Sequence, residues 1–116
     1  MGYITDFKLE LIGESDKVSE FKATLIKKVE EADDEYVDDV EVLLEYGTVY
    51  GKLYDLEDWI YYAAKENPDV LVILNGDGEG SDDVWELRIK GETSEKLYAQ
   101  IPPFTNPELM VPTDKN

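Results

Sequence analysis

A strand–turn–strand pattern occupies residues 70–90, which read VLVILNGDGEGSDDVWELRIK. The first five of these residues, Val70 to Leu74, are all aliphatic and predict a buried strand at the centre of a sheet. After a glycine-rich acidic turn, Trp85, Leu87 and Ile89 alternate with charged side chains, which is typical of a strand with one buried face. The two strands are therefore expected to pair as an antiparallel hairpin.

The pattern continues towards the C-terminus. A turn at Gly91 to Ser94 leads to Leu97, Ala99 and Ile101 at alternate positions, so a third strand should complete a meander. The residues that follow hold four of the five prolines in the chain. We therefore predict one domain over residues 1–101 and a proline-rich tail over residues 102–116.

A helix is predicted before the hairpin. Residues 56–66 carry apolar side chains at helical spacing, and Asp55 precedes them as an N-cap. Asn67 and Pro68 should end this helix, because proline cannot continue it.

The N-terminal part of the chain predicts a strand followed by another helix. Apolar side chains alternate with charged ones over residues 3–11, as in a half-buried strand. From Val18 to Ala32 the apolar residues recur at steps of three and four, and Ser15 is a suitable N-cap.

The next stretch, residues 30–39, reads EEADDEYVDD and should fray or form a loop. Negative charge at the end of a helix opposes the helix macrodipole, which is why we expect the helix to end poorly here. From Val40 to Tyr46, apolar residues at alternate positions predict a second strand, and residues 48–54 a short partner strand interrupted at Gly51.

Strands and helices in this order predict an α+β fold. The expected architecture is a ferredoxin-like sandwich, in which a mainly antiparallel sheet carries two helices on one face.

Charge is the dominant feature of the composition. The chain has 28 acidic and 11 basic residues among 116, giving a formal net charge of −17. A content of 42% hydrophobic residues is enough for a folded core, which argues against disorder. Such a charge repels nucleic acid and anionic membranes and attracts basic protein surfaces. We therefore expect a protein partner and neither direct nucleic-acid binding nor membrane binding.

Cysteine and histidine are both absent. Their absence excludes disulfides, thiolate nucleophiles, histidine acid–base catalysis and zinc sites built from these residues. The first residues lack the basic and apolar regions of a signal peptide. The sequence thus favours a cytoplasmic protein that is not an enzyme and needs no cofactor or metal.

Five short motifs follow one another over about residues 50–92. They are Lys52-Leu53-Tyr54-Asp55, Asn67-Pro68-Asp69-Val70-Leu71, Gly76-Asp77-Gly78-Glu79-Gly80, Asp83-Val84-Trp85 and Lys90-Gly91. This order resembles a broad group of small ferredoxin-like proteins of phages and mobile elements. The resemblance implies that fold and setting, but no general activity and no catalytic residues. The chain departs from the group at Asn67, where an aromatic residue is usual, and in its acidic run.

Residues 30–45 are the first candidate site, because they hold nine carboxylates. Duplex DNA carries one charge per ~1.7 Å of its axis, so a protein that imitates DNA needs carboxylates at high density. Tyr36 is a candidate anchor at the interface. A second acidic group lies in the turn of the hairpin. The candidate partner-binding residues are Glu30, Glu31, Asp33, Asp34, Glu35, Tyr36, Asp38, Asp39, Glu41, Glu45, Asp77, Glu79, Asp82 and Asp83.

These residues predict an inhibitor that acts in the host cytoplasm by mimicking nucleic acid. It would bind the basic surface of a host nucleic-acid-binding defence protein, in the manner of anti-CRISPR or anti-restriction proteins. The same acidic run is also typical of a solvated surface that only keeps a protein soluble. An alternative function is that of a non-enzymatic adaptor or regulatory module that binds a protein through an exposed sheet edge and tyrosines.

Two further interpretations of the hairpin turn stay open. Asn75, Asp77, Glu79, Gly80 and Glu86 match the ligand spacing of an EF-hand calcium loop, although strands flank them where helices are required. The neighbouring carboxylates also have the composition of a magnesium site or an acid–base pair, but no basic residue accompanies them to hold a phosphate.

Overall fold

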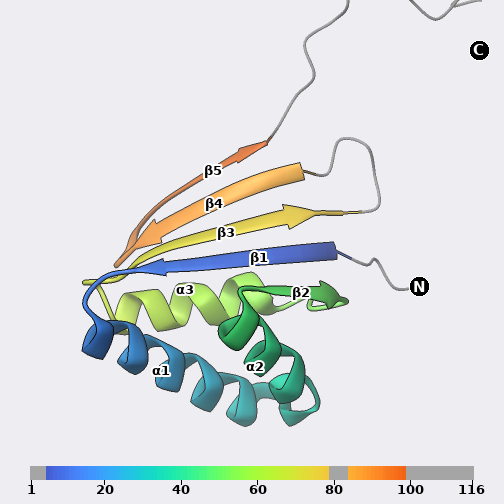
Figure 1. Ribbon diagram of the computed structural model, residues 1–116, viewed down its shortest axis with the longest axis horizontal. Coiled ribbons are helices and arrows are strands. Elements are labelled where there is room, and N and C mark those ends of the chain that lie inside the picture. The colour runs from blue at the N-terminus through green and yellow to red at the C-terminus, as the bar shows by residue number, and fades with distance from the viewer. Residues whose placement is uncertain (1–4, 79–83, 99–116) are drawn as a thin grey trace, which may run out of the picture.

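The computed structural model of the protein describes residues 5–78 and 84–98. Over these residues the chain forms a sheet with its helices packed against one face (Figure 1). The elements are β1 (Thr5–Ile12), α1 (Ser15–Asp33), the 3₁₀ turn η1 (Asp34–Tyr36), α2 (Val37–Tyr46), β2 (Thr48–Gly51), α3 (Leu56–Glu66), β3 (Leu71–Asp77), β4 (Val84–Lys90) and β5 (Thr93–Tyr98). The predicted boundary between domain and tail lies outside the described residues, as do Tyr3, Ala99 and Ile101.

The five strands form one sheet in the order β2-β1-β3-β4-β5, and every neighbouring pair is antiparallel. β3 is the middle strand, which confirms the prediction made from its aliphatic run. β2 and β3 both pair with β1 from opposite sides, so they run parallel to each other, and α3 connects them (Figure 1). The described part of the chain is therefore α+β with an antiparallel sheet.

Alternation along the strands separates a buried face from an open one. Val72 and Leu74 of β3 are buried, and they pair in register with Ile89 and Leu87 of β4. α1 contributes three fully buried side chains to the same core, at helical spacing: Phe21, Leu25 and Val29. The core thus lies between the sheet and the helices, and burial of its apolar surface holds the two layers together.

Residues 37–46 form the helix α2, so the prediction of a strand over Val40 to Tyr46 was wrong. The apolar residues of this stretch satisfy both periods, but the buried ones are Val40 and Leu43, three positions apart. Val42 and Tyr46, which a strand would bury with Val40, are 40% and 70% exposed. Gly47 then ends the helix in the left-handed conformation, with φ 79°, and its N–H donates to the carbonyl of Leu43.

The acidic run is helical, which corrects the prediction of a loop or frayed end, and the described residues hold three α-helices where two were expected. The Asp33 side chain accepts a hydrogen bond from the Glu35 N–H and caps η1. Asp38 and Asp39 fall in the first turn of α2, where the macrodipole favours negative charge. The negative charge at the end of α1 does not fray it, because a second helix begins where α1 ends.

The other helix boundaries follow the sequence closely. α1 begins at Ser15, but its N-cap residue is Glu14, one position earlier than predicted, and no side chain caps it. α3 has the predicted flanking residues, Asp55 and Asn67, but the Asp55 side chain makes no capping hydrogen bond. The Asn67 amide donates to the carbonyl of Ala63 at 2.8 Å and to the hydroxyl of Thr24 at 3.1 Å. This asparagine therefore links the end of α3 to α1.

Candidate acidic interface

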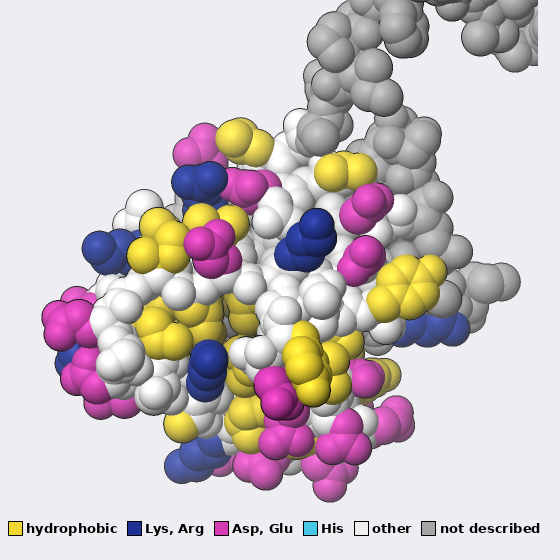
Figure 2. Space-filling view, viewed as in Figure 1, with side chains coloured by type: hydrophobic (Ala, Val, Ile, Leu, Met, Phe, Trp, Pro, Cys, Tyr) yellow, Lys and Arg dark blue, Asp and Glu magenta, His cyan; other side chains and the backbone are white. Residues whose placement is uncertain are grey.

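The end of α1, η1 and α2 together form what we call the acidic corner, residues 30–45. All nine of its carboxylates are exposed: Glu30, Glu31, Asp33, Asp34, Glu35, Asp38, Asp39, Glu41 and Glu45. Figure 2 shows acidic side chains gathered along the lower edge of the molecule, where α2 and the end of α1 lie in Figure 1. The structure thus places the first group of predicted residues on three consecutive elements, the end of α1, η1 and α2, with every carboxylate exposed.

Helical geometry sets the spacing of the charges on α2. Asp38, Glu41 and Glu45 are three and four positions apart, so they lie on one face of the helix at rises of about 4.5 and 6 Å. One strand of DNA carries a charge every ~3.4 Å along the axis. This face alone is sparser than a DNA strand, and the neighbouring carboxylates of η1 and Asp39 raise the density.

No carboxylate of the acidic corner forms an ion pair with any residue that the structure describes. Within residues 5–78 and 84–98 the ion pairs are Glu86 with Arg88 and Glu57 with Lys96. Lys28 of α1 lies over the ring of Tyr62, with its Nζ 4.6 Å from the ring centroid. The negative charge of the corner is therefore left for solvent, counterions or a partner.

Tyr36 is partly buried and joins the corner to α3. Its ring lies 6.1 Å from the ring of Trp59, centroid to centroid, with the planes tilted by 45°. Burial, followed by the charges of Glu35 and Asp33, raises the pKa of Tyr36 above its ordinary value. The phenol therefore stays neutral near pH 7, and its ring fixes η1 against the start of α3.

The second predicted acidic group is not part of the corner. Asp77 lies at the end of β3, opposite Asp6 of β1 on the open face of the sheet, whereas the corner lies on helices. Glu79, Asp82 and Asp83 lie outside the described residues. The structure therefore separates Asp77 from the other candidates that it describes.

The hairpin does not have the geometry of an EF-hand over the residues described, because β3 and β4 flank the turn. The Asn75 amide donates to Glu86 Oε1 at 2.9 Å, and Arg88 donates to the other oxygen of this carboxylate. The hydrogen bond from Asn75, and then that from Arg88, lower the pKa of Glu86 below its ordinary value. In the described part of the chain, no group of three or more acidic side chains is placed to hold a metal ion.

One feature that the sequence did not predict is an aromatic hollow of about 220 Å³ at the end of the sheet. It lies between the strands and the start of α3, and its lining residues are Thr5, Phe7, Leu53, Tyr54, Glu57, Trp85, Lys96 and Tyr98. The available signal was the alternation along β5, which places Lys96 and Tyr98 on the same sheet face as Trp85. It becomes informative only once the pairing of β4 with β5 is known.

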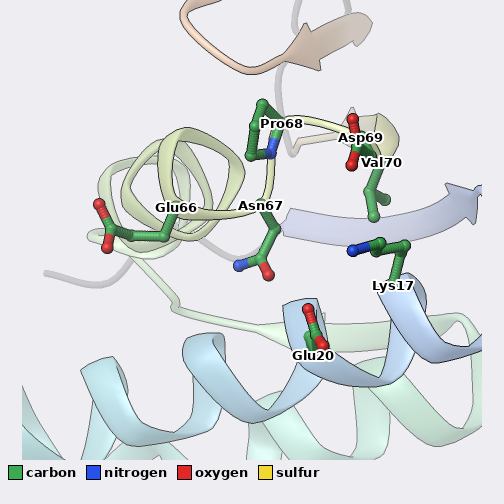
Figure 3. A pocket seen from close by; sticks show the side chains of 7 residues that line it. All are labelled: Lys17, Glu20, Glu66, Asn67, Pro68, Asp69 and Val70. Atoms are coloured by element: carbon green, nitrogen blue, oxygen red, sulfur yellow. The ribbon is translucent and has the colours of Figure 1, made fainter.

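A smaller hollow of about 80 Å³ lies where α3 turns into β3, beside the start of α1 (Figure 3). In Figure 3 the Asn67 side chain points towards α1, and Glu20 and Lys17 reach up from that helix. The hydrogen bonds of Asn67 described above account for its orientation. This hollow is too small for a drug-sized ligand, which needs about 300 Å³ or more.

None of the helices in the described residues is long and apolar enough to span a bilayer. Comparison of the chain with protein-family models, with curated proteins and with solved structures finds no match.

Proposed function

We propose that this protein is a phage or mobile-element inhibitor that occupies the basic channel of a host nucleic-acid-binding defence protein. In this proposal the acidic corner takes the place of nucleic acid, as in anti-CRISPR or anti-restriction proteins. The observation that carries the proposal is the exposure of nine carboxylates on residues 30–45, with no lysine or arginine among them. Binding alone is sufficient for such inhibition, so the proposal needs no catalytic group and no cofactor.

The helical form of the corner strengthens this proposal. Carboxylates held on packed helices lose less conformational entropy on binding than carboxylates on a loop, so more of the electrostatic attraction remains as affinity. The net charge of −17 would also speed the encounter with a basic surface at low ionic strength. Such binding weakens with added salt, because ions screen the charges.

The phage or mobile-element setting rests on the resemblance over about residues 50–92. The finer description of the fold as a ferredoxin-like sandwich is likewise a proposal. It is supported by one split unit, in which β1 lies between the parallel strands β2 and β3 and α3 connects them.

The test compares two variants that lose the same number of charges. The first neutralises the corner: Asp34→Asn, Glu35→Gln, Asp38→Asn, Glu41→Gln and Glu45→Gln. The control neutralises five exposed carboxylates elsewhere: Asp6→Asn, Glu10→Gln, Glu14→Gln, Asp16→Asn and Glu95→Gln. Each protein is immobilised, exposed at low salt to nuclease-treated host lysate, and eluted with increasing salt. Mass spectrometry then identifies the captured proteins, and duplex DNA is tested as a competitor.

We expect the wild type and the control to retain a nucleic-acid-binding enzyme that duplex DNA displaces and moderate salt elutes. The corner variant should not retain this enzyme. Retention of the same protein by the corner variant, or retention that survives high salt, would count against nucleic-acid mimicry.

The alternative, a protein-binding adaptor, is favoured by one observation at the edge strand. Every residue of β5 except Lys96 is exposed, including Leu97 at 63% and Tyr98 at 57%. An extended segment of a partner can add to such an edge through main-chain hydrogen bonds. Partner binding that is lost on substitution in β5, but not in the corner, would support this alternative.

A further inference from the structure

The aromatic hollow contains a cation that belongs to the chain itself. Lys96 Nζ lies 4.3 Å from the ring centroid of Trp85 and 5.4 Å from that of Tyr98. The same nitrogen donates to Glu57 Oε1 at 3.0 Å. Two ring faces and a carboxylate thus surround one ammonium group, and these are the groups that attract a cation in aromatic recognition sites.

The electrostatics of the hollow agree with this geometry. Burial by itself would lower the pKa of Lys96, but the hydrogen bonds and charges of Glu57 and Tyr98 together outweigh it, and the pKa is raised above its ordinary value. The Lys96 side chain is only 28% exposed. The site therefore holds a positive charge while partly excluding water, and space of about 220 Å³ remains beside it.

The hollow also borders the acidic corner. Tyr54, just before α3, and Glu57, in its first turn, line the hollow, and Tyr36 of the corner packs against Trp59, two residues after Glu57. Tyr54 and Asp55 are close enough to Tyr36 to affect its pKa. Tyr54 therefore lies both in the lining of the hollow and near Tyr36 of the corner, so a basic partner bound at the corner would lie close to the hollow.

We propose that the aromatic hollow binds an arginine side chain of a basic protein partner, which displaces the Lys96 ammonium from between Glu57 and the rings. The guanidinium group suits this exchange, because it is planar, weakly hydrated, and able to stack on a ring while pairing with a carboxylate. This inference rests on the proposed function in one respect, namely that the partner is a basic protein.

Exchange with Lys96 gives the proposal a direction that can be measured. The tethered ammonium competes with any incoming cation, so its removal should tighten cation binding and leave Glu57 unpaired. We expect Lys96→Gln to bind an arginine probe at least about twofold more tightly than the wild type does. Tyr98→Ser, at an exposed position, should weaken binding by about the same factor.

The probe is N-acetyl-arginine amide, and its neutral control is N-acetyl-citrulline amide, which has nearly the same shape. Each is titrated into isotope-labelled full-length protein, and the assigned indole N–H of Trp85 is followed by NMR. The expected result is a saturable shift at Trp85 with the arginine probe only, tighter in Lys96→Gln and weaker in Tyr98→Ser. Tyr46→Ser, at the exposed last residue of α2, is the matched control and should bind as the wild type does.

Three results would overturn the inference. The two probes could act equally, Lys96→Gln could bind less tightly than the wild type, or the shifts could be confined to residues 30–45. The last of these would leave the proposed function standing, because the corner would still attract cations. Conversely, saturable binding at Trp85 that persists in the five-residue corner variant would support the hollow even if nucleic-acid mimicry fails.

Discussion

The acidic corner and the centre of the sheet place different physical constraints on their side chains. In the corner, charge lies on the surface and no ion pair with a described residue offsets it. In the middle strand of the sheet, close packing leaves almost no space for a larger side chain. Gly76 of β3 lies directly opposite Trp85 of β4, and a Cβ added to this glycine would lie 2.3 Å from two atoms of the indole ring. If the corner binds a partner as proposed, stability and binding depend on different residues, and substitutions should affect them separately.

The largest effect should come from the core beside that glycine. Leu74 is fully buried between β1 and β4, so Leu74→Ala leaves a cavity and should lower the free energy of unfolding by about 2–5 kcal/mol in urea titrations. Leu97→Ala, on an exposed position of β5, is the control and should change it by less than about 0.5 kcal/mol. Similar losses at both positions would show that the described burial does not govern stability.

Gly76→Ala should have the next largest effect. The added methyl group must push the Trp85 ring away, and overpacking of this kind lowers the free energy of unfolding by about 1–3 kcal/mol. Gly51→Ala is the matched control, because nothing lies within 4 Å of its added Cβ and its φ is not positive. A neutral result at Gly76, measured by the same urea titration, would contradict the close packing of Trp85 on β3.

A pair of charge reversals tests whether α2 is a helix with a macrodipole. Glu45 lies in the last turn and Asp38 in the first. Both changes to lysine relieve the net negative charge equally, but Glu45→Lys should stabilise the fold by about 0.3–1 kcal/mol relative to Asp38→Lys. Thermal unfolding at low salt measures the difference, and added salt should shrink it. Equal effects would argue against the helical assignment of the corner.

The smallest effect should be the dependence of stability on pH at Glu86. Its pKa is lowered from 4.5 in the folded protein by hydrogen bonds from Asn75 and Arg88. Stability from these contacts is therefore present above about pH 4.5 and is lost as the pH falls through the lowered value. Asn75→Ala should move the Glu86 pKa, measured by NMR titration, back towards its ordinary value. At acidic pH the stability of the Asn75→Ala variant should approach that of the wild type. A Glu86 titration unchanged by the substitution would exclude the contact with Asn75.

An aliphatic run predicted β3, and periodicity predicted β1, α1, α3 and β4, because each of these has one buried face with a clear period. A strand was also expected at β5, but Leu97, one of the apolar residues that indicated it, is 63% exposed. Periodicity failed for α2, where apolar residues from Val40 to Tyr46 fit a strand and a helix alike. The burial of Leu43 and the exposure of Val42 and Tyr46 separate the two. Composition pointed to the carboxylates of the corner but not to their helical support. The aromatic hollow could not be predicted, because the contact between Glu57 and Lys96 follows only from the strand order and register.

Gly47 has a mechanical consequence. Its carbonyl accepts a hydrogen bond at 2.8 Å from the N–H of Leu9 in β1, immediately after the last turn of α2. At the other end of α2, the ring of Tyr36 lies against Trp59. α2 is therefore attached to the rest of the protein at both ends. Force applied to α2 by a bound partner would be transmitted to the sheet and to α3. Under such force the two proteins should separate before α2 unfolds from the sheet and α3.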